Sequence, residues 1–350
     1  MSDLNSESDL NSESDLNSES TVYHQGADRS LVILYVHGND SRDYLQRMVS
    51  CDLARISPEQ GSRGTLLDGK GRIQAVFDLL QWDDGFLLVT GEQESLALKS
   101  RLESMVILED VEIETDSHIW FHLHGDGAPQ RMHELGYAGT GSFLATTPTD
   151  TALLVFRPRF HPHGYDLLVT ADHGEALASS LAEMGEVATE ELREQGRILL
   201  GMPKSGAEMG ERTLPPEVGL GDAVAYDKGC YAGQEVLARI RTYGHVNREI
   251  RRLDFMAETE STGPAAGDDL WPADGGEKPI GKITSVTPTP TGWAAIASLR
   301  YKFLQEAKAS DEAKASDAAE ASQKVVWNKG GDPELIGALK PVYSPQPQES

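Results

Sequence analysis

The chain has 350 residues, with 56 acidic and 31 basic side chains and a formal net charge of −25. This charge argues against a general nucleic-acid binder and against a protein of anionic membrane surfaces, because both need a basic surface. The length predicts two or three domains, and the two cysteines, Cys51 and Cys230, make neither a disulfide framework nor a Cys-x-x-Cys metal site, which fits a reducing compartment.

The chain opens with an acidic repeat, Ser-Asp-Leu-Asn-Ser-Glu, which occurs three times before residue 20 without a basic side chain. Such a composition is typical of disorder, and it lacks the cationic and apolar parts of a secretion signal. We therefore expect a disordered acidic tail over residues 1–29. No run approaches the ~20 apolar residues of a membrane span, so the expected location is the cytoplasm.

Strand and helix patterns then alternate over residues 30–125, which we expect to form a first α+β domain. Two apolar, β-rich runs within 72–90 flank Asp83-Asp84-Gly85, and this pattern predicts a hairpin. The pattern of residues 92–105 predicts a helix with four apolar side chains, Leu96, Leu98, Leu102 and Met105.

A similar order of helices and strands over residues 126–248 predicts a second α+β domain. Short strands with Gly- and Pro-rich turns then indicate a β-barrel over 249–345, interrupted by a low-complexity insert at 306–322. The predicted fold class is therefore α+β, with two antiparallel-sheet domains followed by a barrel.

The run Lys228-Gly229-Cys230-Tyr231-Ala232-Gly233-Gln234-Glu235 is the most informative stretch of the chain. It places a thiol near an ammonium group, on a glycine turn before a short predicted helix over 234–241. A cation and a helix N-terminus both favour thiolate over thiol. A lone cysteine in a turn is also compatible with ordinary packing, so both readings stay open at this point. Glu235 and Arg239 stand one helical turn apart, which favours an ion pair.

This run resembles the hallmark of the YgfZ-type folate-binding proteins, which are relatives of the glycine-cleavage T-protein, an aminomethyltransferase. Weaker similarities lie at Cys51-Asp52-Leu53, at Leu66–Ile73 and at Leu214–Glu217. The resemblance implies a T-protein-like ring of three domains, with tetrahydrofolate or another reduced folate held in a central channel. It also implies a role in assembly or repair of iron–sulfur proteins, including enzymes of tRNA modification.

The resemblance implies roles for particular residues. Cys230 would be a redox-sensitive or reactive thiol, and Lys228 would activate it or anchor a folate carboxylate. The remaining candidates for folate contact or for shaping the motif are Gly229, Tyr231, Gly233, Gln234, Glu235, Arg239 and Asp52.

Two departures from the T-protein pattern bear on catalysis. The register from Lys70-Gly71 places Gln74 where the T-protein has a catalytic acid, and an amide does not act as a carboxylate base. Leu199 likewise stands where the T-protein has a pterin-contacting glutamate. These residues argue against aminomethyl transfer and favour a protein that binds folate without transforming it.

Histidine pairs at His122 and His124 and at His161 and His163 lack a third ligand in register, so no metal site is expected. The expected partners are folate and iron–sulfur client proteins, with no direct nucleic acid, no membrane and a monomeric state. Two alternatives stay open: a folate-dependent one-carbon transferase, and a protein-interaction module that binds no folate.

Overall fold

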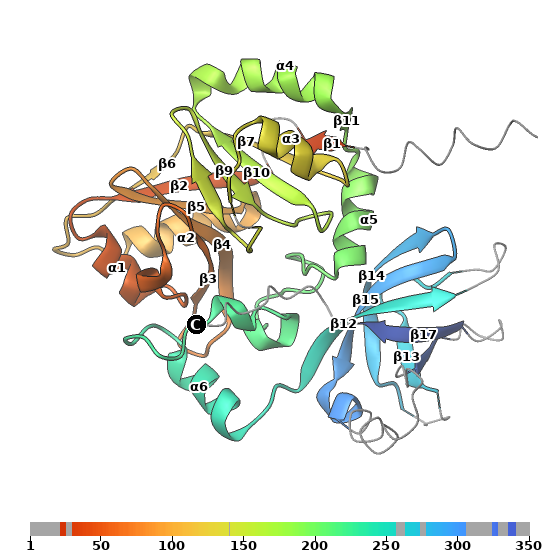
Figure 1. Cartoon of the computed structure of the whole chain (residues 1–350). Coiled ribbons are helices and arrows are strands. Elements are labelled where there is room, and N and C mark those ends of the chain that lie inside the picture. The colour runs from red at the N-terminus through yellow and green to blue at the C-terminus, as the bar shows by residue number, and fades with distance from the viewer. Residues whose placement is uncertain are drawn as a thin grey trace, which may run out of the picture.

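Figure 1 shows the computed structural model of the chain, which describes residues 22–25, 30–139, 141–256, 263–273, 278–305, 324–327 and 335–340. The acidic repeat and the insert expected at 306–322 lie outside these residues. The described residues form two sheets with covering helices and a separate closed barrel, which confirms the predicted α+β class. None of their helices is both long and apolar enough to cross a membrane.

The first sheet has five antiparallel strands in the order β3-β4-β5-β2-β6. Their bounds are β2 Leu31–His37, β3 Ser62–Leu67, β4 Ile73–Trp82, β5 Gly85–Gly91 and β6 Glu112–Thr115. Strands β4 and β5 form the predicted hairpin. Helices α1 (Ser41–Met48) and α2 (Glu92–Glu103) pack their apolar side chains on the outer face of this sheet.

The second sheet has the order β11-β1-β7-β10-β9-β8. Its strands are β1 Tyr23–Gln25, β7 Ile119–His124, β8 Thr146–Pro148, β9 Ala152–Phe156, β10 Gly164–Val169 and β11 Glu186–Val187. Helices α3 (Ala128–Glu134) and α4 (Gly174–Met184) cover its outer face.

The inner faces of the two sheets pack against each other. Leu80 and Leu87 of the first sheet share a buried cluster with Trp120, Leu153 and Leu168 of the second. The result is a four-layer arrangement, helices–sheet–sheet–helices, in the upper left of Figure 1. Each sheet is thus buried on both faces, which explains the near-continuous apolar runs in β5 and β10.

One local expectation differs from the structure. Strand β1 falls inside the range 1–29 that we expected to be a tail, because its backbone completes the sheet between β7 and β11. Among the apolar side chains of the helix predicted over 92–105, Leu96 is 80% exposed. Leu98 and Leu102, one turn apart, form the buried face of α2, and Leu96 lies about 200° around the helix from Leu98.

The barrel closes in the order β12-β15-β14-β13-β16-β17 and lies on the right of Figure 1. Its strands are β12 Arg248–Met256, β13 Asp269–Pro272, β14 Gly281–Thr289, β15 Gly292–Arg300, β16 Lys324–Trp327 and β17 Leu335–Lys340. Helix α5 (Glu190–Leu200) follows the second sheet in the chain and packs against strands β14 and β15 of the barrel. On α5 the buried Arg197 donates hydrogen bonds to Glu208 at 3.1 Å and to the Ser285 hydroxyl of β14 at 2.8 Å.

One apolar cluster joins the first sheet, the helices that follow the second sheet and the barrel, and we call it the junction cluster. Its members come from the first sheet, from α5, from helix α6 (Gln234–Tyr243), from the connection before α6 and from the barrel. They include Leu67, Ile73, Ile198, Val218, Leu237, Ile250 and Ile296. The motif of residues 228–235 therefore lies where the parts of the molecule meet.

Three histidines are buried in the second sheet: His24 on β1, and His122 and His124 on β7. Burial lowers the pKa of all three and brings that of His124 to about 2. For His122 the carboxylate of Asp166, 2.8 Å from Nδ1, offsets part of this effect.

We expect the chain to lose stability as the pH falls below 6.5, the ordinary pKa of histidine. A folded-state pKa below that of the unfolded chain favours the neutral form, so its contribution is complete above pH 6.5 and lost below it. Each such histidine contributes about 1.4 kcal/mol per pH unit in that range. Urea unfolding at pH 7.5 and 5.5 measures the slope. A His124→Gln variant should flatten it, and an unchanged slope in that variant would contradict the prediction.

Candidate functional site

The motif forms a loop that packs directly on the turn between β3 and β4. Gly233 has a left-handed φ of 81°, and a Cβ there would lie 2.6 Å from the Gly71 Cα and 2.7 Å from the Asp68 carbonyl oxygen. The Asp68 carboxylate in turn accepts hydrogen bonds from the backbone N–H groups of Lys70 and Arg72. Two stretches that stand out in the sequence, 66–73 and 228–235, are therefore in backbone contact.

Lys228 fixes the start of this loop to the end of α1. Its ammonium group donates to the carbonyl oxygens of Gln46 at 2.7 Å, Val49 at 2.7 Å and Cys51 at 2.6 Å. A cation at a helix C-terminus also interacts favourably with the helix dipole. An ammonium group has three N–H donors, and all three are used here, so a folate carboxylate at this point would have to replace a carbonyl.

The next motif residues also serve the loop itself. Tyr231 is buried, and its hydroxyl donates to the Ala225 carbonyl at 2.9 Å. The Gln234 amide donates to the Lys228 carbonyl at 3.2 Å, at the first residue of α6. Both side chains hold the loop in one conformation.

Cys230, Glu235 and Arg239 differ from these neighbours because they are exposed. The thiol of Cys230 is on the surface of the loop, four residues before α6 begins. Among the ion pairs of the described residues, none joins Glu235 to Arg239, so the expected pair is absent. The thiol of the loop and these two charged side chains of α6 therefore all remain accessible.

Cys51 and Asp52 follow the end of α1, and the Cys51 carbonyl accepts a hydrogen bond from Lys228 of the loop. The Asp52 carboxylate accepts from the Gln46 amide at 2.8 Å and from the Ala54 N–H at 3.1 Å. Burial opposes ionisation of Asp52, but these hydrogen bonds and the charges of Arg55 and Lys228 hold its pKa below the ordinary value. Burial raises the pKa of the Cys51 thiol to about 12, so it is an inert packed residue, as predicted.

A cavity of about 440 Å³ opens after the β3–β4 turn. It lies between the start of β4, the start of α2 and the loop of residues 205–211. Gln74 lines it, together with the carboxylates of Glu94 and Glu211 and the hydroxyl of Ser205. Glu94 accepts a hydrogen bond from the Ser205 hydroxyl and one from the Val76 N–H at 3.4 Å. A ligand in this cavity would meet carboxylate acceptors and one amide, a set that suits N–H donors.

Glu94 is the residue that the sequence did not single out. It lies 20 residues after Gln74 on a helix that reads as ordinary amphipathic surface. Only the position of α2 against β4 places its carboxylate in the same cavity. The other acid of that first helical turn, the exposed Glu92, gives the same sequence signal, so the sequence alone could not have separated the two.

Comparison with solved structures identifies the fold. The chain superposes on the glycine cleavage system aminomethyltransferase T from Bartonella henselae with a TM-score of 0.75 and 17% identity, covering 94% of this chain and 88% of that one. This match confirms the predicted T-protein-like fold. The chain matches no protein-family model.

Comparison of sequences points to one group of proteins. The tRNA-modifying protein YgfZ of Vibrio atlanticus is 28% identical over 217 residues, which cover 61% of this chain and 64% of that protein. The tRNA-modifying protein YgfZ of Vibrio vulnificus (strain YJ016) is 26% identical over 254 residues, covering 70% and 76%. The chain is a relative of the YgfZ proteins. The resemblance drawn from the motif is thereby confirmed. The chain thus spans just under two thirds of the length of the Vibrio atlanticus protein.

Proposed function

We propose that the chain is a folate-binding accessory protein that supports the assembly or repair of iron–sulfur proteins, with Cys230 as its reactive group. The observation that carries the proposal is the contrast within the motif loop. Lys228, Tyr231, Gly233 and Gln234 are each occupied in holding the loop, whereas the Cys230 thiol is exposed. A thiol on a rigid and accessible loop suits reversible chemistry with a partner.

The folate part of the proposal is supported by the T-protein-like fold and by the cavity at Gln74. A reduced folate such as tetrahydrofolate carries a pterin with several N–H donors, which the carboxylates of Glu94 and Glu211 could accept. Residues 30–125 supply Ile73, Gln74 and Glu94 to this lining and would act as the first part of the folate site, with the loop of residues 205–211 opposite. The amide of Gln74 favours binding over one-carbon transfer.

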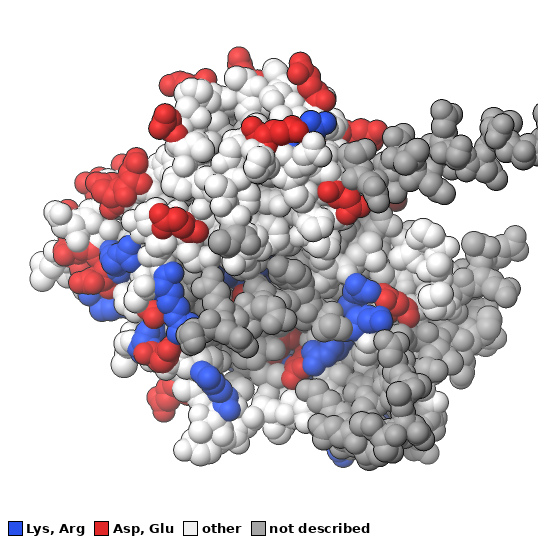
Figure 2. Space-filling model, viewed as in Figure 1, with Lys and Arg blue, Asp and Glu red and all other residues white. Residues whose placement is uncertain are grey.

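The clients that we propose are iron–sulfur proteins, including enzymes of tRNA modification, since the YgfZ relatives are named tRNA-modifying proteins. The chain would act on these enzymes and not on the RNA. On the face drawn in Figure 2, acidic side chains spread over the region of α4, and basic side chains lie mainly in the lower half among acidic ones. We propose a monomer that works in the cytoplasm.

We expect Cys230→Ser to abolish most of the support that the chain gives to iron–sulfur enzymes, by tenfold or more, because a hydroxyl is not a thiolate nucleophile or cluster ligand. The measurement is the activity of an iron–sulfur tRNA-modifying enzyme in a deletion strain that carries each variant. Because Cys230 is exposed, the variant should fold normally. Full restoration by Cys230→Ser would overturn the role of the thiol.

Cys51→Ala is the matched control, since it removes the other thiol of the chain from a buried position. It should retain client support once its stability has been checked. Calorimetric titration with tetrahydrofolate tests the folate part separately: wild type and Cys230→Ser should bind equally. Absence of saturable binding would favour the interaction module without folate.

One observation favours the alternative of a folate-dependent one-carbon transferase. Glu94 supplies a carboxylate to the cavity in which Gln74 replaces the expected acid. If Glu94 acted as the base, purified protein would turn over tetrahydrofolate with a methylamine donor. That turnover would survive Cys230→Ser and fail in Glu94→Gln, which separates the transferase from the accessory protein.

A further inference from the structure

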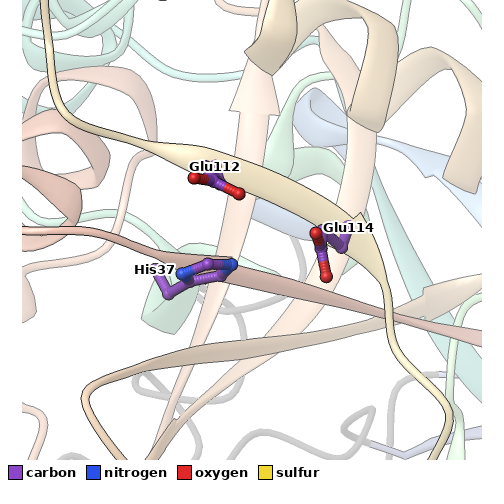
Figure 3. Close-up of side chains that lie close together, drawn as sticks. All are labelled: His37, Glu112 and Glu114. Atoms are coloured by element: carbon purple, nitrogen blue, oxygen red, sulfur yellow. The ribbon is translucent and has the colours of Figure 1, made fainter.

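The end of strand β2 and the start of β6 bring a histidine and two glutamates together. None of the three lines the cavity at Gln74. His37 stands opposite Glu112 in the β2–β6 ladder, and Tyr35 stands opposite Glu114. Residues two apart on a strand share a face, so both carboxylates lie on one side of β6. Figure 3 shows the His37 ring beside the two carboxylates. One ligand atom from each of the three residues lies within 4.8 Å of the others.

The backbone around these side chains is held in place. Gly38 has a left-handed φ of 110°, and a Cβ there would clash with the Asp110 carbonyl oxygen, so the two segments touch. The Asn39 amide donates to Asp110 at 2.6 Å, and Asp40 accepts from the Asp110 N–H at 2.8 Å. The end of β2 and the residues before β6 are therefore fixed relative to each other.

The His37 ring is also held by an aromatic contact with Tyr35. Tyr35 stacks on it with ring centres 4.7 Å apart, and the Tyr35 hydroxyl donates to Asp84 at 2.6 Å. His37 further lines a cavity of about 460 Å³, together with Asn39, Arg42 and Asp84. The imidazole thus has a supported position next to a space that can hold water or a small ligand.

The two carboxylates of this cluster form no ion pair with a Lys or Arg side chain of the residues that the structure describes. Among the hydrogen bonds and ion pairs of the described residues, none involves the side chain of His37, Glu112 or Glu114. Two carboxylates so close together on one strand repel each other unless a cation lies between them.

We propose that His37, Glu112 and Glu114 bind a divalent cation of the first transition row, such as Zn²⁺ or Mn²⁺. One imidazole and two carboxylates make a mixed nitrogen and oxygen set that suits these ions, and the nitrogen disfavours Mg²⁺ and Ca²⁺. Ligand atoms that share such an ion stand roughly 3–3.5 Å apart, given bonds of about 2.1 Å. The exposed glutamates can close the remaining distance by rotation of their side chains. Three protein ligands leave a coordination position for water or an exogenous ligand.

The test uses the full chain after treatment with a chelator. Because Cys230 could capture Zn²⁺, calorimetry with ZnCl₂ is done in a Cys230→Ser background, and electron paramagnetic resonance follows Mn²⁺ in the wild type. One ion per chain is expected, with affinity lowered 10- to 100-fold or more by His37→Gln and by Glu112→Gln with Glu114→Gln. Glu190→Gln with Glu191→Gln, an exposed acidic pair at the start of α5, is the matched control and should bind as the parent does.

The variants should keep the unfolding temperature of the metal-free parent, because Glu112 and Glu114 are exposed on the edge strand β6 and His37 is half-buried at the last residue of β2. Absence of stoichiometric binding, or equal binding by the His37→Gln variant and its parent, would overturn the proposal. Displacement of Zn²⁺ by equimolar Mg²⁺ would overturn the assignment to transition metals.

Discussion

Gly233→Ala is expected to destabilise the chain by about 2–5 kcal/mol. A residue with a side chain in the left-handed region costs roughly 1–2 kcal/mol, and overpacking against rigid atoms adds about 1–3 kcal/mol. The atoms that the new methyl group would meet belong to the backbone of Asp68 and Gly71, so no side chain can rotate away. The loop would have to move off the β3–β4 turn, and the junction cluster would open with it.

Gly229→Ala is the matched control for this prediction, four residues earlier in the same motif. A Cβ at Gly229 meets no atom within 4 Å. Urea unfolding at pH 7.5 measures both variants against the wild type. Similar stability losses at the two glycines would show that the contact between Gly233 and Gly71 is not what requires glycine.

Lys228→Met should cost about 3 kcal/mol and should also reduce client support. Methionine preserves the length of the apolar stem but leaves the carbonyls of Gln46, Val49 and Cys51 without their donor. Each buried carbonyl left without a partner costs about 1–3 kcal/mol, and part of this is recovered by local relaxation. Burial lowers the pKa of Lys228 to about 8, so the ammonium form still dominates at neutral pH.

Lys282→Met supplies the comparison, because Lys282 forms an exposed ion pair with Asp269 at 2.8 Å. Surface pairs of this kind contribute 0–1 kcal/mol at most. Chemical denaturation gives the stability of each variant, and the rate of Cys230 alkylation reports whether the loop has become mobile. Equal stability in the two variants would mean that Lys228 is only a surface lysine.

Much of the fold follows from local sequence patterns. The Asp83-Asp84-Gly85 turn between two apolar runs specified the β4–β5 hairpin, because loop length and turn chemistry together fix the register. The motif of 228–235 pointed to the right family, and four of its residues, Lys228, Tyr231, Gly233 and Gln234, make the contacts that hold the loop. The exposure of Leu96 follows from helix geometry, since residues three or four apart share a face and Leu96 lies two residues before the buried Leu98.

The site depended on contacts between distant segments, which local patterns do not reveal. Nothing in the sequence around Lys228 indicates that its ammonium group caps α1, which lies about 180 residues earlier. The same limit applies to Glu94 in the cavity at Gln74. It applies as well to His37, whose neighbours Glu112 and Glu114 follow some 75 residues later.

The contacts made by Lys228 also bear on the order in which the molecule folds. The hydrogen bond from Lys228 to the Cys51 carbonyl closes a loop of 177 residues, and most of both sheets and the whole of α5 lie inside that loop. Closing so long a loop is entropically costly until the segments within it have already become compact. We therefore expect the hydrogen bonds of Lys228 to form after the two sheets have assembled. In a growing or partly unfolded chain, Cys230 is then on a segment that Lys228 does not yet hold. A client would meet the thiol in its fixed position only on a chain whose N-terminal layers are complete.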